Sequence, residues 1–300
     1  KLDKAVEAFK KALLFQPNYA DAYNNLGNAL RNQGKLDEAI DVYKKGTILK
    51  PDYAYVYNNL GKALQDQDKF DEAIEAYNKC ISLKPNFTEV YNNLGKSLRK
   101  IGKLDQAINA YKKALLLKPD YEIVYNNMGI ALQEQGKLDE AMHAYHKALS
   151  LKPDYAIVYN NMGNLLRDQV KLDEAIDAYN KSVSLEPDYA ESYSNMGVTL
   201  KFQGKLDEAI EAFNKSISLK PDYAQGHHNL GLALLNKGRV KEGLDECEWR
   251  WQTDKFLSQQ RHFVQPLWDG KLSLSGKRIL LWSEQGIGDT LNWSSCLPYV

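Results

Sequence analysis

Residues 20–53 read ADAYNNLGNALRNQGKLDEAIDVYKKGTILKPDY, and this stretch recurs along the chain every 34 residues. Proline, glycine and alanine keep their register from copy to copy. The prolines are Pro17, Pro51, Pro85, Pro119, Pro153, Pro187 and Pro221, the glycines Gly27, Gly61, Gly95, Gly129, Gly163, Gly197 and Gly231, and the alanines Ala39, Ala73, Ala107, Ala141, Ala175 and Ala209. A fixed period of this length indicates a solenoid, in which each copy buries its apolar face against its neighbours.

Each copy predicts two helices. Asp52 follows a proline and precedes an apolar-periodic run, so its side chain is expected to cap the first helix. Gly34 ends that helix, because glycine readily adopts the left-handed conformation. A second helix runs from Leu36 and stops before Pro51. The apolar face of the first helix consists of Ala22, Tyr23, Leu26, Ala29 and Leu30, and its opposite edge carries Asn24, Asn25, Asn28 and Arg31.

A glycine inside the first helix, Gly27 in the first complete copy, predicts close packing of two backbones. Glycine in a helix interior costs about 1 kcal/mol relative to alanine, so a compensating contact is needed. We expect Gly27 to lie opposite Ala39, with Tyr23 and Tyr43 filling the space on either side.

The 34-residue period, with Asn-Leu-Gly in one half, Ala-Ile in the other and a closing proline, resembles the tetratricopeptide repeat. The resemblance implies an all-α, right-handed superhelical solenoid. On this pattern residues 1–19 are the second helix of a truncated repeat, 20–223 are six complete repeats and 224–257 are a degenerate capping repeat.

The two ends of the solenoid lead to further expectations. Val6, Phe9 and Leu13 form an apolar face whose partner helix is absent, so we expect the natural protein to extend N-terminally and the cut ends of this chain to self-associate. In the capping repeat Leu244, Cys247 and Trp251 are expected on the covering face. The alternative for the tryptophans is a carbohydrate-stacking set formed by Trp249, Trp251 and Trp268.

The amino-acid composition argues against several classes of function. The chain holds 39 basic and 39 acidic residues, so it has no nucleic-acid footprint, and it has no apolar run of membrane-spanning length. Its three cysteines lie far apart, and Cys80 stands at a small-residue core site, which favours reduced thiols and a cytoplasmic setting. His143 and His146 lie three residues apart on a helix without a third ligand, so no metal site is expected. His227 and His228 replace a Tyr-Asn pair, and His227 is expected to be a packing substitute.

The sequence pattern changes after the repeats. Residues 258–275 lose the period and are interpreted as a linker. The run RILLW at 278–282 predicts a buried strand, the turn at 286–289 contains two glycines, and residues 290–300 suggest a helix. Residues 276–300 therefore predict the beginning of a truncated α/β, Rossmann-like unit, although the turn lacks the full dinucleotide fingerprint.

The pieces EWRW, PLWDG, GKRILLWSEQGIGDT and LPYV look like bacterial proteins in which tetratricopeptide repeats precede a glycosyltransferase domain similar to the heptosyltransferases. The resemblance implies a nucleotide-sugar donor for the parent enzyme and a catalytic base at Asp289. The donor-binding half would follow Val300, so no cofactor and no transferase activity are expected in this chain. The alternative is a non-catalytic scaffold that assembles a protein complex.

Paired asparagines are the most regular polar feature. The second members are Asn25, Asn59, Asn93, Asn127, Asn161, Asn195 and Asn229, and the first members are Asn24, Asn58, Asn92, Asn126 and Asn160. They resemble the asparagine ladder of the peptide O-GlcNAc transferases, which implies binding of an extended polypeptide backbone on the concave surface. A carboxamide offers both a donor and an acceptor, so it can hold a peptide unit without reading sequence. The alternative is that each asparagine bonds only to the adjacent repeat and tunes the superhelical pitch.

Selectivity in that groove is expected from the variable neighbours of the ladder. The basic ones are Arg31, Lys62, Lys96, Arg99, Arg167 and Lys201. They lack the lysine and arginine set that clamps acidic C-termini in chaperone-binding repeats. The expected partner is a protein or peptide segment in the concave groove, with no nucleic acid and no membrane span.

Overall fold

The computed structural model of the chain describes residues 1–253, which form helix pairs and no strand. The first helices of the repeats are α2 (Ala20–Asn32), α4 (Ala54–Asp66), α6 (Thr88–Lys100), α8 (Glu122–Glu134), α10 (Ala156–Asp168), α12 (Ala190–Phe202) and α14 (Ala224–Asn236). The second helices are α1 (Leu2–Phe15), α3 (Leu36–Leu49), α5 (Phe70–Leu83), α7 (Leu104–Leu117), α9 (Leu138–Leu151), α11 (Leu172–Leu185), α13 (Leu206–Leu219) and α15 (Val240–Cys247), followed by the 3-10 helix η1 (Glu248–Gln252).

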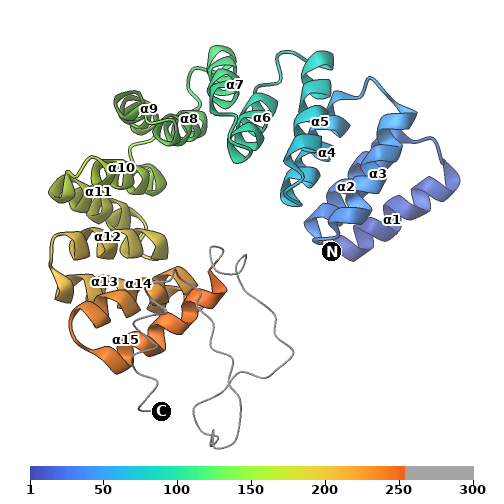
Figure 1. The fold of residues 1–300 in the computed structure, drawn as a ribbon. Helices are drawn as coiled ribbons and strands as arrows, with labels where there is room; N and C mark the ends of the chain where they lie inside the picture. Colours follow the sequence, from blue (N-terminus) through green and yellow to red (C-terminus); the bar gives the residue numbers. More distant parts are fainter. Residues whose placement is uncertain (254–300) are drawn as a thin grey trace, which may run out of the picture.

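The helix pairs stack into an open arc (Figure 1). The first helices of successive repeats contact one another, whereas no substantial contact joins the second helices of successive repeats. The first helices therefore line the inner, concave side, as α6, α8 and α10 show clearly in Figure 1. None of the helices between residues 1 and 253 combines the length and the hydrophobicity needed to cross a membrane.

The turn between the two helices of a repeat follows the expected backbone. Gly34 has a φ of 75°, and Gly102, Gly136 and Gly204 repeat this conformation. Two repeats adopt the same turn without glycine, because Asp68 has a φ of 57° and Val170 a φ of 62°. The turn geometry is thus imposed by the packing of the helix pair rather than by the residue that occupies it.

The expected side-chain cap at Asp52 is wrong. The N-cap of α4 is Tyr53, and it makes no side-chain capping bond. Asp52 lies one residue further out in the turn, where its carbonyl oxygen accepts the N–H of Ala54 at 3.1 Å. Asp52 belongs to the turn that follows Pro51, so α4 begins one residue later than the sequence pattern indicates.

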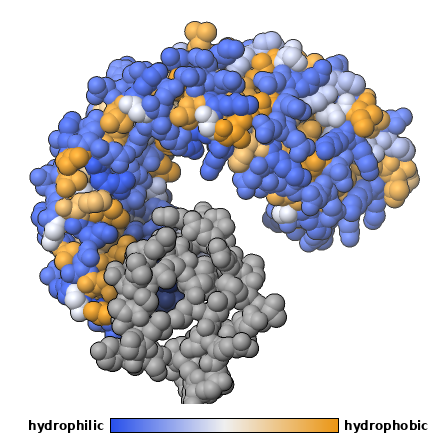
Figure 2. All heavy atoms as spheres, in the orientation of Figure 1, coloured by the Kyte–Doolittle hydropathy of each residue, from blue (hydrophilic) through white to orange (hydrophobic). Residues whose placement is uncertain are grey.

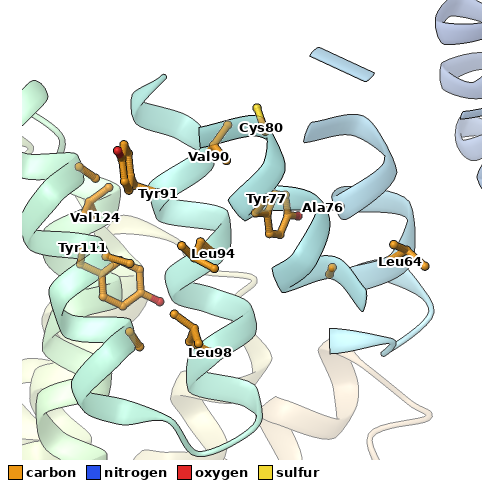
Figure 3. Packing of buried hydrophobic residues seen from close by; sticks show 14 of the residues in the cluster. Leu64, Ala76, Tyr77, Cys80, Val90, Tyr91, Leu94, Leu98, Tyr111 and Val124 are labelled. Atoms are coloured by element: carbon orange, nitrogen blue, oxygen red, sulfur yellow. The ribbon is translucent and has the colours of Figure 1, made fainter. Parts of the chain in front are cut away.

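The mid-helix glycine faces a tyrosine ring: the nearest atoms to a Cβ added at Gly27 belong to Tyr43, which the sequence placed beside this glycine. A Cβ atom added at Gly27 would overlap the ring of Tyr43, and one added at Gly61 would lie 2.5 Å from Cε1 of Tyr77. Figure 3 shows Tyr77 and Tyr111 pointing into the layer between neighbouring helices, together with Leu94 and Leu98. In the six complete repeats the ring that covers the glycine is fully buried; these rings are Tyr43, Tyr77, Tyr111, Tyr145, Tyr179 and Phe213.

The N-terminal end corrects another expectation. The apolar face of α1 has a partner, because it packs on α2: Val6 is buried and Phe9 and Leu13 are half-buried against the core. The apolar face of α1 is therefore covered by the repeat that follows it.

In the last repeat only some of the residues expected on the covering face are buried. Cys247 is buried and Trp251 is half-buried, but Leu244 is 43% exposed. Leu244 is the equivalent of Ile40, and Ile40 is buried in the first complete repeat. Trp268, Asp289, the expected linker at 258–275 and the expected strand at 278–282 lie outside the described residues.

Candidate functional site

The concave side of the arc is the candidate site. Figure 2 shows that hydrophobic residues occur in small separate patches on the coloured part of the face in view. Side chains spaced three, four and seven residues apart on a helix share one face, so each first helix presents a short row of residues to this side. The asparagine pair lies in the middle of that row.

The two asparagines of a pair have different environments. First members such as Asn24, Asn58 and Asn92 are buried, so they do not form an exposed polar edge as the sequence pattern suggested. Asn25 is exposed, and the second members that follow it are half-buried. The first member belongs to the interface between repeats, and the second reaches the concave surface.

Hydrogen bonds join the pairs into a continuous ladder. The Nδ2 of each second member donates to the Oδ1 of the first member in the preceding repeat. The distances are 2.8 Å for Asn59 to Asn24, 3.4 Å for Asn93 to Asn58, 2.9 Å for Asn127 to Asn92, 2.9 Å for Asn161 to Asn126 and 3.0 Å for Asn195 to Asn160. The last rung is weaker, because Asn229 donates to Oγ of Ser194 at 3.4 Å.

These bonds use only part of each carboxamide. An asparagine carries two N–H donors and an oxygen with two acceptor sites, and the ladder takes one N–H of each second member. At Asn59 the oxygen also faces Nδ2 of Asn58 at 3.4 Å. The remaining donor and acceptor of each rung can pair with a peptide N–H and C=O, while the cross-repeat bond holds the amide in place.

Tyrosine hydroxyls of the second helices also bind asparagines of the first helices, a contact that the sequence did not predict. The hydroxyl of Tyr43 donates to Oδ1 of Asn28 at 2.7 Å, and that of Tyr179 to Oδ1 of Asn164 at 2.8 Å. Burial raises the pKa of the Tyr179 phenol to about 12, and it raises that of Tyr43 further still. The signal that could have found these contacts is the shared period of the glycine and the tyrosine.

The six basic residues expected to give selectivity fall into two groups. Arg31 pairs with Asp66 at 2.6 Å and Arg99 with Glu134 at 2.5 Å, so their charges are balanced by the next repeat. Each partner lies 35 residues along the chain, the same offset as in the ladder, and this offset was the unused sequence signal. Arg167 lies 3.5 Å from Asp168, because Phe202 stands at the next acidic position.

The lysines of the set are different. No ion pair or hydrogen bond within residues 1–253 engages the ammonium group of Lys62 or Lys96. Burial lowers the pKa of Lys62, as do the neighbouring charges of Arg31 and Lys96, while Glu89 opposes them. Burial alone lowers the pKa of Lys201. Unlike the paired arginines, Lys62 and Lys96 can offer their charge to a ligand.

The ladder ends where histidines replace the Tyr-Asn pair. His227 is buried as expected of a packing substitute, and its ring stacks on Trp249 with centroids 4.0 Å apart. Its nitrogens face Oε2 of Glu246 at 2.6 Å and the carbonyl of Pro221 at 2.9 Å. Trp249 is half-buried, and the ring of His227 covers one of its faces at the end of the solenoid.

The described part of the chain offers no metal cluster. His143 and His146 are exposed on α9, and no group of three potential ligands comes together between residues 1 and 253. Cys80 and Cys247 are buried free thiols whose pKa values are raised by burial, to about 11 for Cys80. Neither cysteine is thus poised as a nucleophile.

Family comparisons cover most of the described chain. TPR repeat matches lie at residues 27–68, 95–136, 163–203 and 201–238. Tetratricopeptide repeat matches lie at 54–87 and 123–155 and at 8–41 and 76–109. A search of curated proteins gives no match.

Solved structures share the fold at low sequence identity. Yeast Tom70 has a TM-score of 0.67 at 19% identity, over 86% of this chain and 57% of its own. A tetratricopeptide repeat protein from Parabacteroides merdae has a TM-score of 0.67 at 21% identity, over 78% and 92%. The APC/C hetero-tetramer Cut9-Hcn1 has a TM-score of 0.64 at 19% identity, over 85% of this chain and 50% of its own, so the chain spans about half the length of that relative. The repeats, the helix pairs that they form and the family matches agree: the chain belongs to the tetratricopeptide repeat family.

Proposed function

We propose that the concave side binds an extended polypeptide segment and that the second asparagine of each repeat holds its backbone. The observation that carries the proposal is the ladder itself, in which Asn59, Asn127 and Asn161 donate one N–H across the repeat boundary at 2.8–2.9 Å. The other half of each carboxamide is left for a ligand. A rung that is already held in position loses little side-chain freedom on binding, which favours affinity.

The spacing of the rungs suits an extended chain. Packed helices lie about 10 Å apart, and an extended strand rises about 3.3 Å per residue. Each rung therefore meets about every third residue of the ligand. Because a peptide unit is the same in every residue, the ladder supplies affinity, and the flanking side chains supply selectivity.

The competing role is architectural, and the cross-repeat hydrogen bonds favour it as well. Replacing Asn93, Asn127 and Asn161 together by alanine separates the two roles. The proposal predicts at least about a tenfold loss of affinity for extended peptides, as measured by fluorescence anisotropy. The matched control replaces Asn78, Asn109 and Asn180, which are exposed on the second helices, and should leave affinity unchanged.

Two results decide between the roles. If the concave variant melts at a much lower temperature than the control but binds peptides with unchanged affinity, the ladder is architecture alone and the proposal is wrong. If affinity falls while the helical circular dichroism at the working temperature stays that of the parent chain, the ladder is a binding surface.

At the level of the whole protein, we propose that this solenoid recognises the acceptor or partner of a cytoplasmic glycosyltransferase with a nucleotide-sugar donor. The support is the resemblance of the C-terminal stretch, including Asp289. The test is sugar transfer to a groove-bound peptide by the natural full-length protein, with Asp289→Asn as the inactive control. Peptide binding without transfer in either protein would favour a non-catalytic scaffold instead.

A further inference from the structure

The concave surface changes its chemistry along the solenoid, and this change indicates which segments it binds. Two rows of residues flank the ladder: a start row four residues before each rung and a mid row three residues after it. The start row is Asp21, Tyr55, Glu89, Ile123, Ile157, Glu191 and Gln225, and the mid row is Asn28, Lys62, Lys96, Ile130, Asn164, Val198 and Leu232. Both rows lie within one helical turn of the ladder, so they contact the side chains of any backbone that the rungs hold.

The second and third repeats form a basic part. Lys62 and Lys96 occupy the mid row of adjacent first helices, and no acidic side chain within the described residues pairs with either. Burial lowers the pKa of Lys62, the nearby charges of Arg31 and Lys96 act in the same direction, and the carboxylates of Glu89 and Asp66 act against them. Two ammonium groups at this spacing repel each other, and a carboxylate between or beside them would remove the repulsion.

The fourth and fifth repeats form an apolar part. Ile123 and Ile157 occupy the start row and are each 40% exposed, and Ile130 is half-buried in the mid row. In the repeats on either side the start row carries Glu89 and Glu191. Branched aliphatic residues thus replace carboxylates in the start row over two adjacent repeats.

We propose that the groove selects an internal, extended segment with acidic side chains against Lys62 and Lys96 and aliphatic side chains against Ile123 and Ile157. This inference rests on the proposed function, because the ladder sets the path of the backbone. The rungs continue on both sides of the two parts, from Asn25 to Asn229, so the segment passes through rather than ending there. The centres of the two parts lie two repeats apart, which corresponds to about six residues of extended chain.

The test uses labelled peptides of about 15 residues, the length that spans five rungs. One peptide has glutamates three residues apart and then, about six residues on, isoleucines three residues apart. Its matched forms replace the glutamates by glutamine or the isoleucines by serine. The protein variants are Lys62→Gln with Lys96→Gln, and Ile123→Thr with Ile157→Thr.

We expect each protein variant to weaken the binding only of the peptide that carries the matching side chains. The lysine variant should lose about tenfold in affinity for the glutamate peptide and less than about twofold for its glutamine form. The isoleucine variant should discriminate in the same way between the isoleucine and serine forms. A control with the exposed outer residues Lys79 and Lys113 changed to glutamine should bind all peptides like the parent chain.

The outcomes separate this inference from the proposed function. If all peptides bind equally and all lose affinity in the asparagine variant, the ladder function stands and the selectivity inference is wrong. If the lysine and isoleucine effects appear but the asparagine variant binds normally, the path along the ladder is wrong and both statements fail. Absence of binding by every peptide overturns both as well.

Discussion

At the residue scale, the contact between the mid-helix glycine of the first helix and the tyrosine of the second helix explains why both residues recur in the repeat. The glycine of the first helix has no side chain because the tyrosine of the second helix lies directly on it. The same tyrosine then carries its hydroxyl through to the concave face, as Tyr43 does to Asn28. The glycine and the tyrosine are therefore one packing unit, and each constrains the choice of the other.

Substituting this glycine should destabilise the fold, whereas the same change at another buried helical glycine should not. A Cβ at Gly61 would lie 2.5 Å from the Tyr77 ring, so Gly61→Ala should lower the free energy of unfolding by about 1–3 kcal/mol through overpacking. At Gly46 the nearest atom would be a Val56 methyl at 3.4 Å, so Gly46→Ala should raise it by up to about 1 kcal/mol through helix propensity. Urea unfolding followed by circular dichroism measures both, and equal effects of the two changes would contradict this account of the glycine.

Val170 is a second residue whose cost can be measured. Its φ of 62° places a β-branched residue in the left-handed region, where the other repeats mostly have glycine. Val170→Gly should therefore raise the free energy of unfolding by about 1 kcal/mol. Asp68→Gly should give a smaller gain, because aspartate tolerates this conformation better. A loss of stability in the valine variant would show that its exposed side chain makes a contribution that the turn geometry does not reveal.

At the element scale, the contact between neighbouring repeats is not uniform. The packing of α9 against α10 is less extensive than at the other junctions between a second helix and the next first helix. Leu165, which is fully buried in α10, stands where the equivalent residues are Ala63, Ser97, Ala131 and Thr199. The bond from Asn161 to Asn126 is nevertheless retained at this junction.

The second helices make stability depend on pH in the alkaline range. Burial raises the pKa of Tyr77, Tyr111 and Tyr145 above the ordinary value of 10.0, so the folded chain keeps these phenols neutral at a pH where the unfolded chain ionises them. Their contribution is fully present below pH 10 and is lost as the pH rises above it. Replacing the three tyrosines by phenylalanine, which Phe213 shows to be compatible with the site, should flatten this loss.

The measurement compares urea midpoints of the parent chain and the triple phenylalanine variant. Lysines also lose their charge in this range, so the difference between the two proteins, rather than either profile, carries the information. The variant should be equal or slightly less stable near neutral pH and gain relative to the parent at about pH 11. Parallel profiles would mean that the phenols are not buried as described.

At the scale of the whole molecule, the period of the sequence was enough to predict the fold. Pro51 and Gly34 mark the helix ends correctly, because they act through local backbone preferences. That the Tyr43 ring lies directly on Gly27 rather than beside it could not be predicted, because this depends on the crossing of two helices. The same is true of the arginines: an unpaired Arg31 and an Arg31 held by Asp66 have the same local sequence, and only the stacking of repeats brings the two charges together.

The candidate site was predictable in position but not in detail. The regularity of Asn25, Asn59 and their equivalents indicated a ladder, since a polar residue kept in register through every repeat must face a common environment. The direction of its hydrogen bonds, from each second member to the first member of the preceding repeat, follows from the offset between stacked helices. That offset decides that Asn24 is buried and Asn59 reaches the groove.

The most direct measurement of the central claim is an amide-to-ester scan of a bound peptide. An ester removes one backbone N–H and weakens the neighbouring carbonyl, while the side chains stay the same. If the ladder holds the backbone, the losses of affinity should recur about every third residue, and they should disappear in the Asn93, Asn127 and Asn161 triple alanine variant. A flat profile, or one that is the same in the parent chain and the variant, would contradict the account.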